Sequence, residues 1–514
     1  MNNKSEISNA TGTSFLDYIL KDATTRKYLL IALGLSIAQF VVFKLMYPFA
    51  DFFSDSYSYI WAAYQHAEIS IWPIGYSKFL SLFHTLTHSD TALVAFQYFF
   101  MQFSALYFFF SIQYYFKTSP WSRKILFAFL FINPLSFYLC NTINSDAIFA
   151  ALSILWLTEL LWILRRPRIY QLLTQAVLLF LCFTIRNNAY YYPLISIFAF
   201  ILSDWNWKIK LTGIVLPFLF IIPFIIQTQN AAYKLTGTRQ FSLFTGWQLA
   251  NNALYIYDQI EVDSTELPTP EAKEINRLSI HFFKTVNPKG YRSFIESFVG
   301  NFFIKYSTAP LKIYYSQHFT PNGQIELNRD WGKASADFEP FGKYIILHHP
   351  IAYARYFMWP NTWHYFFPPL SHLGLYNYGE NKIQKIAQTW FDYPKAEVRS
   401  ISPILQGEIL IIYVAFFMLF NLYFLWQLGR LLLKIYMDSF PARLPAFWMI
   451  TAFLLCNFGF TIFSTVNILR YQVVPMILLI SFGGLINDLI ASKSTQKMKP
   501  GSKNNTETSI LPVI

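Results

Sequence analysis

Long apolar runs separated by short polar segments dominate the hydrophobic pattern of this chain. A helical run of about 17 to 25 apolar residues matches the hydrocarbon core of a bilayer. The pattern therefore predicts about ten transmembrane helices. The predicted helices lie at about 28 to 47, 91 to 116, 123 to 141, 146 to 164, 169 to 185, 190 to 204, 211 to 229, 406 to 427, 445 to 464 and 471 to 490.

A long segment at about 230 to 405 interrupts this pattern, although it is rich in Trp, Tyr and Phe. Its stretches at 271 to 286 and 291 to 306 place apolar residues three and four positions apart, as amphipathic helices do. We expect this segment to form a mainly helical domain that caps the membrane helices. The polar ends are predicted to be a short segment at 1–27 and a disordered tail at 491–514.

The composition changes the class of protein that needs to be considered. Hydrophobic residues make up 54% of the chain and charged residues 13%, whereas about a quarter of the residues in a soluble domain are charged. The net charge of +12 does not indicate a nucleic-acid partner, because the cations form short clusters between apolar runs. The prediction is an all-α polytopic membrane protein that contacts membrane lipids and no nucleic acid.

The same cationic clusters predict the orientation in the membrane, because Lys and Arg concentrate in cytoplasmic loops. Both termini are then cytoplasmic, while the first outer loop at 48–90 and the segment at 230–405 are extracytoplasmic. The clusters are Lys21, Arg26 and Lys27; Lys117, Arg123 and Lys124; Arg165, Arg166 and Arg168; Lys208 and Lys210; and Arg430, Lys434 and Arg443.

Acidic residues at predicted outer helix ends are candidates for chemistry. Asp51 and Asp55 lie in the first outer loop, and Asp146 begins a later apolar helix. Two acids that converge over one cavity can divide the work, one accepting a proton and the other placing an acceptor or a metal ion. The simpler interpretation is that each acid caps a helix, since Asp is a favoured N-cap residue.

Two arginines break the pattern of cytoplasmic cations. Arg186 and Arg470 stand alone in short outer turns at the ends of apolar helices. Arginine binds phosphate through two parallel hydrogen bonds, so a lone arginine at the outer leaflet suits a lipid phosphate. The alternative is a snorkelling side chain, or a structural salt bridge to one of the aspartates.

The sequence offers no recognisable metal site. The histidines of the long segment lack metal-binding spacing and read as ordinary interfacial residues. The three cysteines have no partner at metal-ligand spacing either. The histidines are His348, His349, His364 and His372, and the cysteines are Cys140, Cys182 and Cys456.

Several short motifs follow one another in a definite order. They are AspSerTyrSerTyr at 55–59, AlaAla at 62–63, TrpProIleGlyTyr at 72–76, SerAsp at 145–146, Arg186, GlyTrpGlnLeuAlaAsnAsn at 246–252 and ArgTyr at 470–471. In this order they resemble the GT-C superfamily of membrane glycosyltransferases, the group of the protein O-mannosyltransferases and the lipid A aminoarabinose transferases. The resemblance is best over 28–229 and at the ArgTyr motif.

The resemblance implies a GT-C-like membrane module at 28–229 with a catalytic first outer loop, a capping domain at 230–405 and further transmembrane helices at 406–490. It implies a glycosyltransferase that moves a sugar, with inversion, from a polyprenyl-phosphate donor to a lipid, glycan or protein acceptor. The reaction would take place at the outer face of a bacterial inner membrane. No cofactor is required, and a divalent cation is compatible with this assignment.

The resemblance also implies roles for individual residues. Asp55 becomes the base and Asp146 a second acid near the acceptor or a metal ion, while Arg186, Arg470 and Tyr471 hold the donor phosphate. The first acid of this family is often followed by a second acid, whereas Ser56 follows Asp55 here. Asp51 and Asp146 therefore stay open as alternative bases. The implied substrate-binding residues are Asp51, Tyr59, Tyr76, Trp247, Asn251 and Asn252.

Other functions are compatible with an apolar protein of this kind. One is an assembly or scaffold protein of the envelope, which would not need acids and arginines on separate loops. A transporter or flippase of a lipid-linked glycan would bind the charged head of the lipid without making a bond, and it predicts charges near the middle of helices. The charges here lie mainly at helix ends. A ligase or polymerase that transfers whole glycans from a polyprenyl-linked donor is not separated from a glycosyltransferase by the sequence.

Overall fold

The computed structural model describes residues 13–285, 292, 294–296, 300–319, 327–437, 444–464 and 466–498. These residues are helical apart from their turns and connecting segments, and their only β pairing is in two isolated bridges. Eight of the described helices are long and apolar enough to cross a membrane. The prediction of a helical multi-pass membrane protein is therefore confirmed at this level. Residues 499–514 of the predicted tail and residues 1–12 of the segment at 1–27 lie outside the described residues.

The long helices follow the predicted apolar runs, with boundaries displaced by a few residues. The run at 123 to 141 is broken at Asn133, whose side chain caps the following helix, and at Pro134, which is its first residue. The spans are α2 Ala23–Met46, α5 Asp90–Tyr115, α6 Pro120–Phe131 with α7 Pro134–Asn141, α8 Asp146–Arg165, α11 Trp207–Thr236, α21 Leu405–Tyr436, α22 Pro445–Ser464, and η6 Leu469–Gln472 with α23 Val473–Met498.

Two predicted spans are shorter than a bilayer crossing, which accounts for the difference between about ten expected helices and eight. The runs at 169 to 185 and 190 to 204 form α9 Gln171–Ile185 and α10 Tyr192–Leu202, of 15 and 11 residues. The 3₁₀ helix η1, Asn187–Tyr191, separates them. At 1.5 Å per residue neither helix reaches about 30 Å. The sequence pattern does not show this, because apolar residues continue through the segment where the helix breaks.

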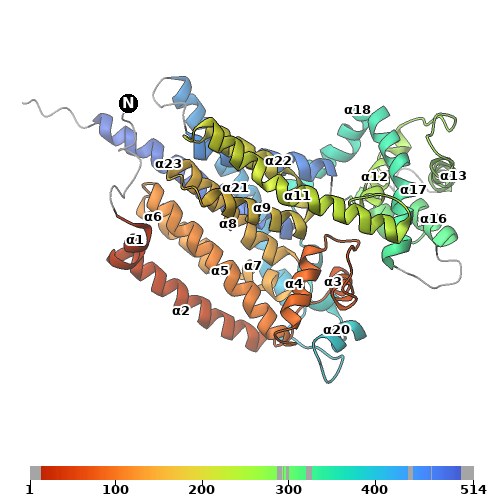
Figure 1. Ribbon diagram of the computed structural model, residues 1–514, viewed down its shortest axis with the longest axis horizontal. Helices are drawn as coiled ribbons and strands as arrows, with labels where there is room; N and C mark the ends of the chain where they lie inside the picture. Colours follow the sequence, from red (N-terminus) through yellow and green to blue (C-terminus); the bar gives the residue numbers. More distant parts are fainter. Residues whose placement is uncertain are drawn as a thin grey trace, which may run out of the picture.

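The bundle is organised around α8. This helix is apolar on all sides, and 89% of its most apolar window is buried, against 17% for α2 and α11. Helices α5, α9, α10, α22 and α23 all contact α8. Figure 1 shows α2 and α11 on opposite margins of the bundle. The outer helices therefore present apolar side chains to their surroundings, as lipid-facing helices do.

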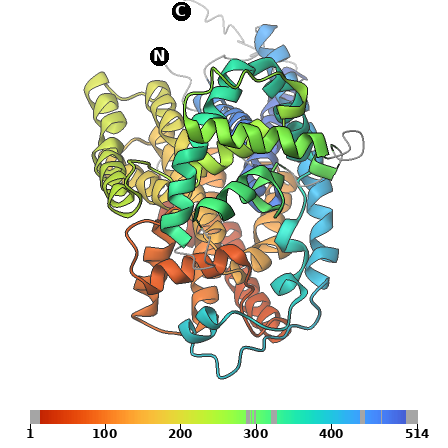
Figure 2. The same cartoon turned by 90° about the vertical axis from the view of Figure 1, so that its right-hand side faces the viewer.

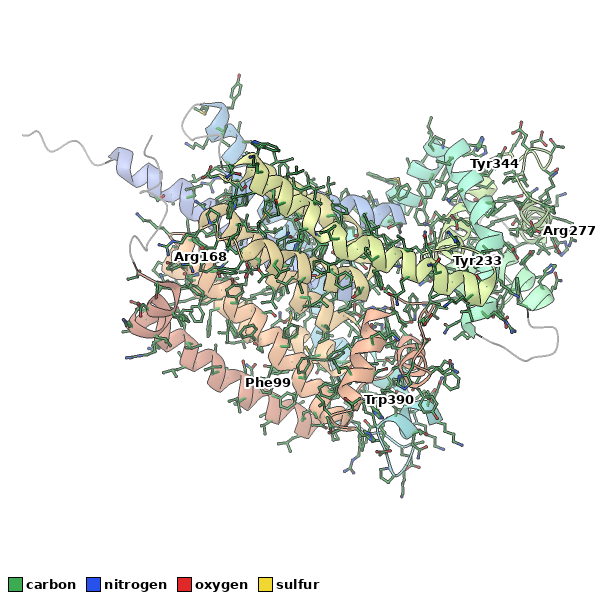
Figure 3. All side chains as sticks on the ribbon, in the orientation of Figure 1. Phe99, Arg168, Tyr233, Arg277, Tyr344 and Trp390 are labelled. Atoms are coloured by element: carbon green, nitrogen blue, oxygen red, sulfur yellow. The ribbon has the colours of Figure 1, made fainter. Side chains whose placement is uncertain are left out.

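The two ends of the bundle differ in character. The start of α1, Phe15–Lys21, and the end of α23 lie at one end, which also holds Arg168 (Figures 1 and 3). The other end carries the short helices of the first loop and the long interrupting segment, where Tyr344 and Arg277 lie (Figure 3). Figure 2 looks onto that second end and shows these short helices covering it.

The first loop folds into α3 Ser54–Tyr64 and α4 Gly75–His84. Phe53 is the N-cap residue of α3, and its backbone N–H donates to Ser56 Oγ at 3.1 Å. Ser56 therefore closes the first turn of the helix. Helix α4 packs against the end of α9 at Gly75, where an added Cβ would lie 2.6 Å from the carbonyl oxygen of Thr184.

The segment at 230–405 packs in two parts. Its first part has a hydrophobic core of its own, built around Trp247, Phe338 and Phe341. Its second part packs into the core of the membrane bundle through residues such as Tyr376 and Trp390. The first part contains α12 Thr245–Leu254, α13 Pro270–Thr285, α15 Phe302–Lys305, α16 Pro310–Phe319, α17 Leu327–His348, α18 Pro350–Tyr353 and η3 Ala354–Met358, and the second part α19 Trp359–Phe366, η4 Ser371–Gly374, η5 Tyr376–Gly379 and α20 Lys385–Trp390.

Candidate functional site

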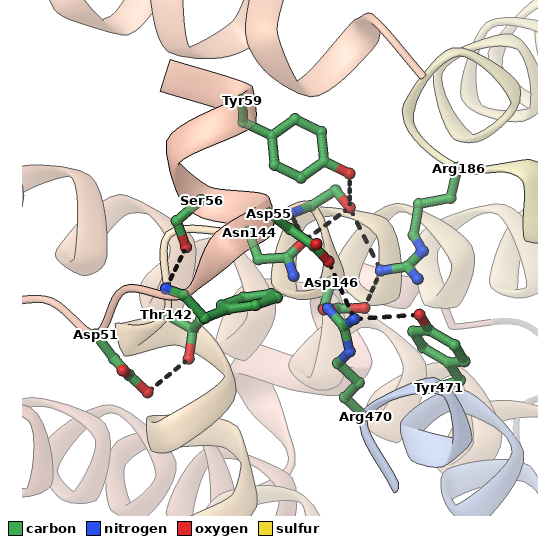
Figure 4. Close-up of polar contacts among 12 residues, drawn as sticks. Asp51, Asp55, Ser56, Tyr59, Thr142, Asn144, Asp146, Arg186, Arg470 and Tyr471 are labelled. Atoms are coloured by element: carbon green, nitrogen blue, oxygen red, sulfur yellow. Dashed lines mark hydrogen bonds and ion pairs between the residues drawn. The ribbon is translucent and has the colours of Figure 1, made fainter. Parts of the chain in front are cut away.

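A cluster of two acids and two arginines lies where the bundle meets the short helices. Asp55 comes from α3, Asp146 from the first residue of α8, Arg186 from the turn after α9 and Arg470 from η6. Figure 4 shows both arginines pointing toward Asp146, with Asp55 beside Arg470. Segments more than 400 positions apart are thus joined here, since Asp55 and Arg470 are separated by 415 positions. We call these four residues the charged cluster.

Asp146 is the centre of the charged cluster. Arg470 Nη1 donates to Asp146 Oδ2 at 2.7 Å, and Arg186 Nη1 donates to Asp146 Oδ1. Arg470 Nη2 also donates to Asp55 Oδ2 at 3.3 Å. The two positive and two negative charges balance, as buried charges must to offset the loss of water. The salt bridge that the sequence left open for the arginines is present.

Asp55 is the more accessible of the two acids. Its side chain is 19% exposed, against 5% for Asp146. Burial raises the pKa of Asp55, and the neighbouring Arg470 opposes that rise. Its Oδ1 has one contact in the described structure, a 3.5 Å hydrogen bond from Ser54. A partly exposed carboxyl group with a raised pKa suits a general base.

Helix capping does not account for either acid. The N-cap residue of α3 is Phe53 and that of α8 is Ser145, so Asp55 and Asp146 both lie inside the first helical turn. There they interact favourably with the positive end of the helix dipole. Their close partners are nevertheless the arginines.

Aromatic rings hold the guanidinium groups in place. The Arg470 guanidinium carbon lies 5.0 Å from the ring centre of Phe53 and 4.9 Å from that of Tyr471. Arg186 lies 4.5 Å from the same Tyr471 ring, and Arg470 Nη2 donates to the Tyr471 hydroxyl at 3.2 Å. Tyr471 therefore contacts both arginines, and cation–π attraction restricts their movement.

His372 is a member of the site that the sequence did not single out. Its ring stacks on Phe53 at 3.8 Å, so Phe53 contacts both His372 and Arg470. Burial lowers the pKa of His372 well below its ordinary value, and the positive charges of Arg470, Lys305 and Arg186 add to this shift. His372 is therefore neutral at pH 7 and adds no charge. Its prediction as an ordinary interfacial histidine is wrong, because it is buried.

Lys305 is a second residue without a signal in the sequence. It ends the short helix α15 in the interrupting segment and is exposed. Partial burial lowers its pKa, while the charge of Asp55 raises it and that of Arg470 lowers it further. Lys305 thus brings a third cation within electrostatic reach of the charged cluster. Only the folding of the interrupting segment over the bundle puts it there.

Several buried polar atoms around the charged cluster have no hydrogen-bond partner among the described residues. They are Arg470 Nε, Asn144 Nδ2, and both polar side-chain atoms of Gln472. Such atoms are uncommon in folded proteins, and each needs an explanation. Beside them, Arg186, Tyr191 and other residues line a small cavity of about 20 Å³, room for about one water molecule.

Asp51 occupies a different place from Asp55, although the two are four positions apart. Its Oδ1 accepts from Asn377 N at 2.8 Å and its Oδ2 from Thr142 Oγ1 at 3.4 Å. Its backbone pairs with Asn141 and Ile143 at 2.9 and 3.0 Å. Asp51 is buried and joins the first loop to two other segments. Asp51 therefore has a structural role, and its expected substrate-binding role stays a prediction.

Tyr59 and Tyr76 lie behind the charged cluster. The Tyr59 hydroxyl hydrogen-bonds Ser145 Oγ at 3.0 Å, and Ser145 in turn accepts from Arg186 Nη1 at 3.3 Å. Tyr76 is fully buried, and its hydroxyl donates to Gln97 at 2.8 Å. Tyr59 therefore supports the turn that carries Asp146, whereas Tyr76 belongs to the core. Neither is an open substrate contact.

The motif at 246–252 builds the core of the interrupting segment and is not a binding surface. An added Cβ on Gly246 would lie 1.7 Å from the Ser335 carbonyl oxygen, so glycine permits the close approach of α12 and α17. Trp247 is buried, and its indole N–H donates to the Trp331 carbonyl oxygen at 3.0 Å. The ring of Trp247 therefore packs inside the segment, and its expected substrate-binding role stays a prediction.

The two asparagines of this motif are also buried and satisfied. Asn251 Nδ2 donates to the Gly300 carbonyl oxygen at 2.8 Å, and its Oδ1 accepts from Phe303 N at 3.1 Å. Asn252 Nδ2 donates to the Tyr353 hydroxyl at 3.2 Å. Both asparagines thus have structural partners, and their expected substrate contacts stay predictions. Through Gly300 and Phe303, Asn251 fixes the chain immediately before Lys305.

A divalent cation does not fit beside Asp146 in this arrangement. Both oxygens of Asp146 already accept from arginines. Among the described residues, no group of three or more His, Cys, Asp or Glu side chains is arranged to hold a metal ion. A cation at Asp146 would have to displace a guanidinium group.

Comparisons with family models, with curated proteins and with solved structures find no match to this chain. The GT-C resemblance of the short motifs therefore stays a prediction. A function for this protein has to be argued from the charged cluster and its surroundings.

Proposed function

We propose that this protein is a GT-C-type membrane glycosyltransferase that moves a sugar from a polyprenyl-phosphate donor to an acceptor hydroxyl at the outer face of a bacterial inner membrane. Both termini then lie in the cytoplasm. The observation that carries the proposal is the charged cluster itself. An accessible carboxyl group with a raised pKa lies beside two arginines, at one end of an apolar helix bundle.

Asp55 is the base in this reaction. Its Oδ1 takes the proton of the acceptor hydroxyl while the hydroxyl oxygen attacks the anomeric carbon of the donor sugar. The bond between that carbon and the phosphate oxygen breaks, and the electron pair leaves with the phosphate. One displacement inverts the anomeric configuration. The raised pKa of Asp55 favours this step, because a stronger base accepts the proton more readily.

The arginines stabilise the departing phosphate. The phosphodiester of the donor carries one negative charge, and the phosphate monoester product carries up to two. Arg186 and Arg470 therefore attract the product more strongly than the donor, which lowers the barrier selectively. Arg470 Nε, a buried donor without a partner among the described residues, offers a further hydrogen bond.

Asp146 orients both arginines toward this position. It holds one nitrogen of each guanidinium group, which leaves other guanidinium N–H groups for phosphate oxygens. The aromatic residues Phe149, Tyr191 and Phe453 line the small cavity beside the arginines and give this side of the charged cluster an apolar wall. Lys305 supplies the additional positive charge that an anionic donor needs in an otherwise balanced cluster.

The test is transfer of radiolabelled sugar from a panel of polyprenyl-phosphate donors by the full-length protein in lipid nanodiscs. We expect Asp55→Asn to lower the rate by about 10² to 10⁴-fold, the range for loss of a general base. Arg470→Ala should abolish measurable transfer. The matched control is Asp263→Asn, which changes an exposed acid that hydrogen-bonds Thr265 far along the chain from the cluster.

Other outcomes reject parts of the proposal. If Asp55→Asn stays active and Asp51→Asn is inactive although folded, Asp51 is the base. If only donors carrying whole glycans react, the protein is a ligase or polymerase. If no donor reacts but labelled lipid crosses the bilayer, it is a flippase and the glycosyltransferase assignment is wrong.

A further inference from the structure

A large cavity lies on the other face of α3 from the charged cluster. Its volume is about 890 Å³. Along α3 it is lined by Ser54, Tyr57, Ser58, Trp61 and Gln65, which recur three or four positions apart and so share one face of the helix. The catalytic function does not use these residues. Helix α3 therefore presents Asp55 to one site and a row of polar and aromatic side chains to another.

Three further segments complete the walls of this cavity. The end of α11 contributes Lys234, the start of α17 contributes Asn328, and the strand-like segment before α20 contributes Gln384. Asn328 Oδ1 accepts from Ile71 N at 3.3 Å, which joins α17 to the first loop. The cavity is thus built jointly by the bundle, the first loop and the interrupting segment, and it falls within the usual size range of ligand sites, about 300 to 1,000 Å³.

The lining combines aliphatic side chains such as Leu235 and Ile386 with aromatic rings and amides, a mixture that suits the apolar and polar faces of a sugar. Trp61 is 43% exposed, and Tyr57 lies one turn before it. Their rings offer apolar faces on which the C–H side of a sugar can stack. Gln65 and Gln384 are exposed and bring amide groups that can both donate and accept. A lipid tail in this cavity would leave these amides without partners, at a cost in free energy.

The charges of the lining are close to balance. Lys234 and Arg329 bring positive charge, while Glu68 brings negative charge. Arg329 also pairs with Asp330, Nε to Oδ1, at 3.0 Å. A strongly anionic ligand therefore finds little excess charge here, and a hydroxyl-rich, uncharged saccharide fits the lining.

Ser54 links the cavity to Asp55, the proposed base. Ser54 lines the cavity, and its hydroxyl donates to Asp55 Oδ1 at 3.5 Å. This is the oxygen of Asp55 that does not contact Arg470. A saccharide held against Trp61 can thus extend a terminal hydroxyl past Ser54 to the accessible oxygen of Asp55.

We propose that this cavity binds the acceptor and that the acceptor is a glycan. Trp61 and Tyr57 supply the stacking surface, and Gln65 and Gln384 bind the hydroxyl groups. Delivery of a hydroxyl to Asp55 rests on the proposed glycosyltransferase function, whereas glycan binding in the cavity does not.

The direct test is binding without any donor. Fluorescently labelled full-length protein in nanodiscs is applied to an array of immobilised uncharged oligosaccharides. We expect a subset of them to bind, with an affinity that falls roughly tenfold in Trp61→Ala, the loss of one aromatic stacking surface. The matched control is Trp359→Ala, which removes an exposed tryptophan that does not line the cavity. Equal binding by Trp61→Ala and wild type, or no binding to any saccharide, would overturn the proposal.

A transfer assay separates this proposal from the proposed function. Glycan binding that depends on Trp61, in a protein that transfers no sugar, would support the cavity and reject the glycosyltransferase. Transfer that requires Asp55 but has the same acceptor KM in Trp61→Ala would reject the cavity and leave the reaction in place. If a peptide or lipid acceptor alone supports transfer, the glycan assignment is wrong.

Discussion

Asp51 and Asp55 are four positions apart, yet they lie in two regions with different electrostatics. Asp51 is buried among neutral donors, a backbone N–H and a threonine hydroxyl, and burial raises its pKa to about 7. Asp55 is partly exposed and its close partner is Arg470. The first region joins three chain segments, whereas the second brings opposite charges together where a ligand can reach them.

The comparison shows that the surroundings of an acid decide whether it has a structural role or is available for catalysis. Neutral hydrogen bonds around Asp51 satisfy its oxygens but do not compensate its charge, so its protonated form is favoured when folded. In the charged cluster, ionised acids are compensated by guanidinium groups. An acidic residue in such a loop is therefore a candidate for catalysis when a cation and an accessible oxygen accompany it.

We expect the largest effect from removing Asp146, the acid at the centre of the charged cluster. Asp146→Ala leaves Arg186 and Arg470 with Asp55 as their remaining acid in the cluster, so we expect a loss of about 3 to 5 kcal/mol in the free energy of unfolding and loss of transfer. Thermal unfolding of the protein in nanodiscs measures the first effect. Asp55→Asn is the matched variant, because it removes one 3.3 Å contact of a partly exposed side chain and should unfold close to wild type. Equal destabilisation by both would contradict the central role of Asp146.

Removing the charge of Asp51 should stabilise the protein, whereas removing that of Asp146 should destabilise it. Because its pKa rises from 3.8 to about 7 on folding, the stability due to its protonated form is complete below pH 3.8 and is lost as the pH rises through about 7. Asp51→Asn has no carboxyl group to ionise, so the variant does not lose this stability as the pH rises. Relative to wild type, the variant should gain up to about 4 kcal/mol between pH 4 and pH 8.

Thermal unfolding of both proteins across this pH range measures the effect of Asp51. Asp263→Asn serves as control, because the pKa of Asp263 is lowered by hydrogen bonds to Thr265 and its removal should not reproduce the gain. Parallel pH profiles of wild type and Asp51→Asn would show that Asp51 is ionised without penalty.

A smaller effect is expected from Lys305, which we propose supplies a further positive charge for the donor. Lys305→Ala should raise the donor KM by roughly fivefold, as expected for about 1 kcal/mol from an exposed charge, and the difference should shrink in high salt. Lys312→Ala is the control, since Lys312 lies over the rings of Trp247 and Trp331 in the interrupting segment. A lowered kcat at unchanged KM would assign Lys305 to the reaction step instead.

The sequence predicted the helices well, because runs of apolar residues report directly on burial in lipid. It predicted about ten spans, whereas eight described helices are long and apolar enough to cross a membrane, because α9 and α10 are short. It also selected Asp55, Asp146, Arg186, Arg470 and Tyr471, since charges at the ends of apolar helices are costly and so stand out. It did not indicate that Trp247, Asn251 and Asn252 are buried, because an aromatic and amide motif looks the same in a core and on a binding surface.

The amino-acid sequence by itself determined a helical, multi-pass membrane protein, since hydropathy depends on neighbouring residues alone. The tertiary structure decided which charges meet. It paired Arg470 with both Asp55 and Asp146, turned Asp51 into a structural link, and brought His372 and Lys305 to the site from the interrupting segment. These contacts join residues that are hundreds of positions apart, and their energies depend on burial and distance, which local sequence does not specify.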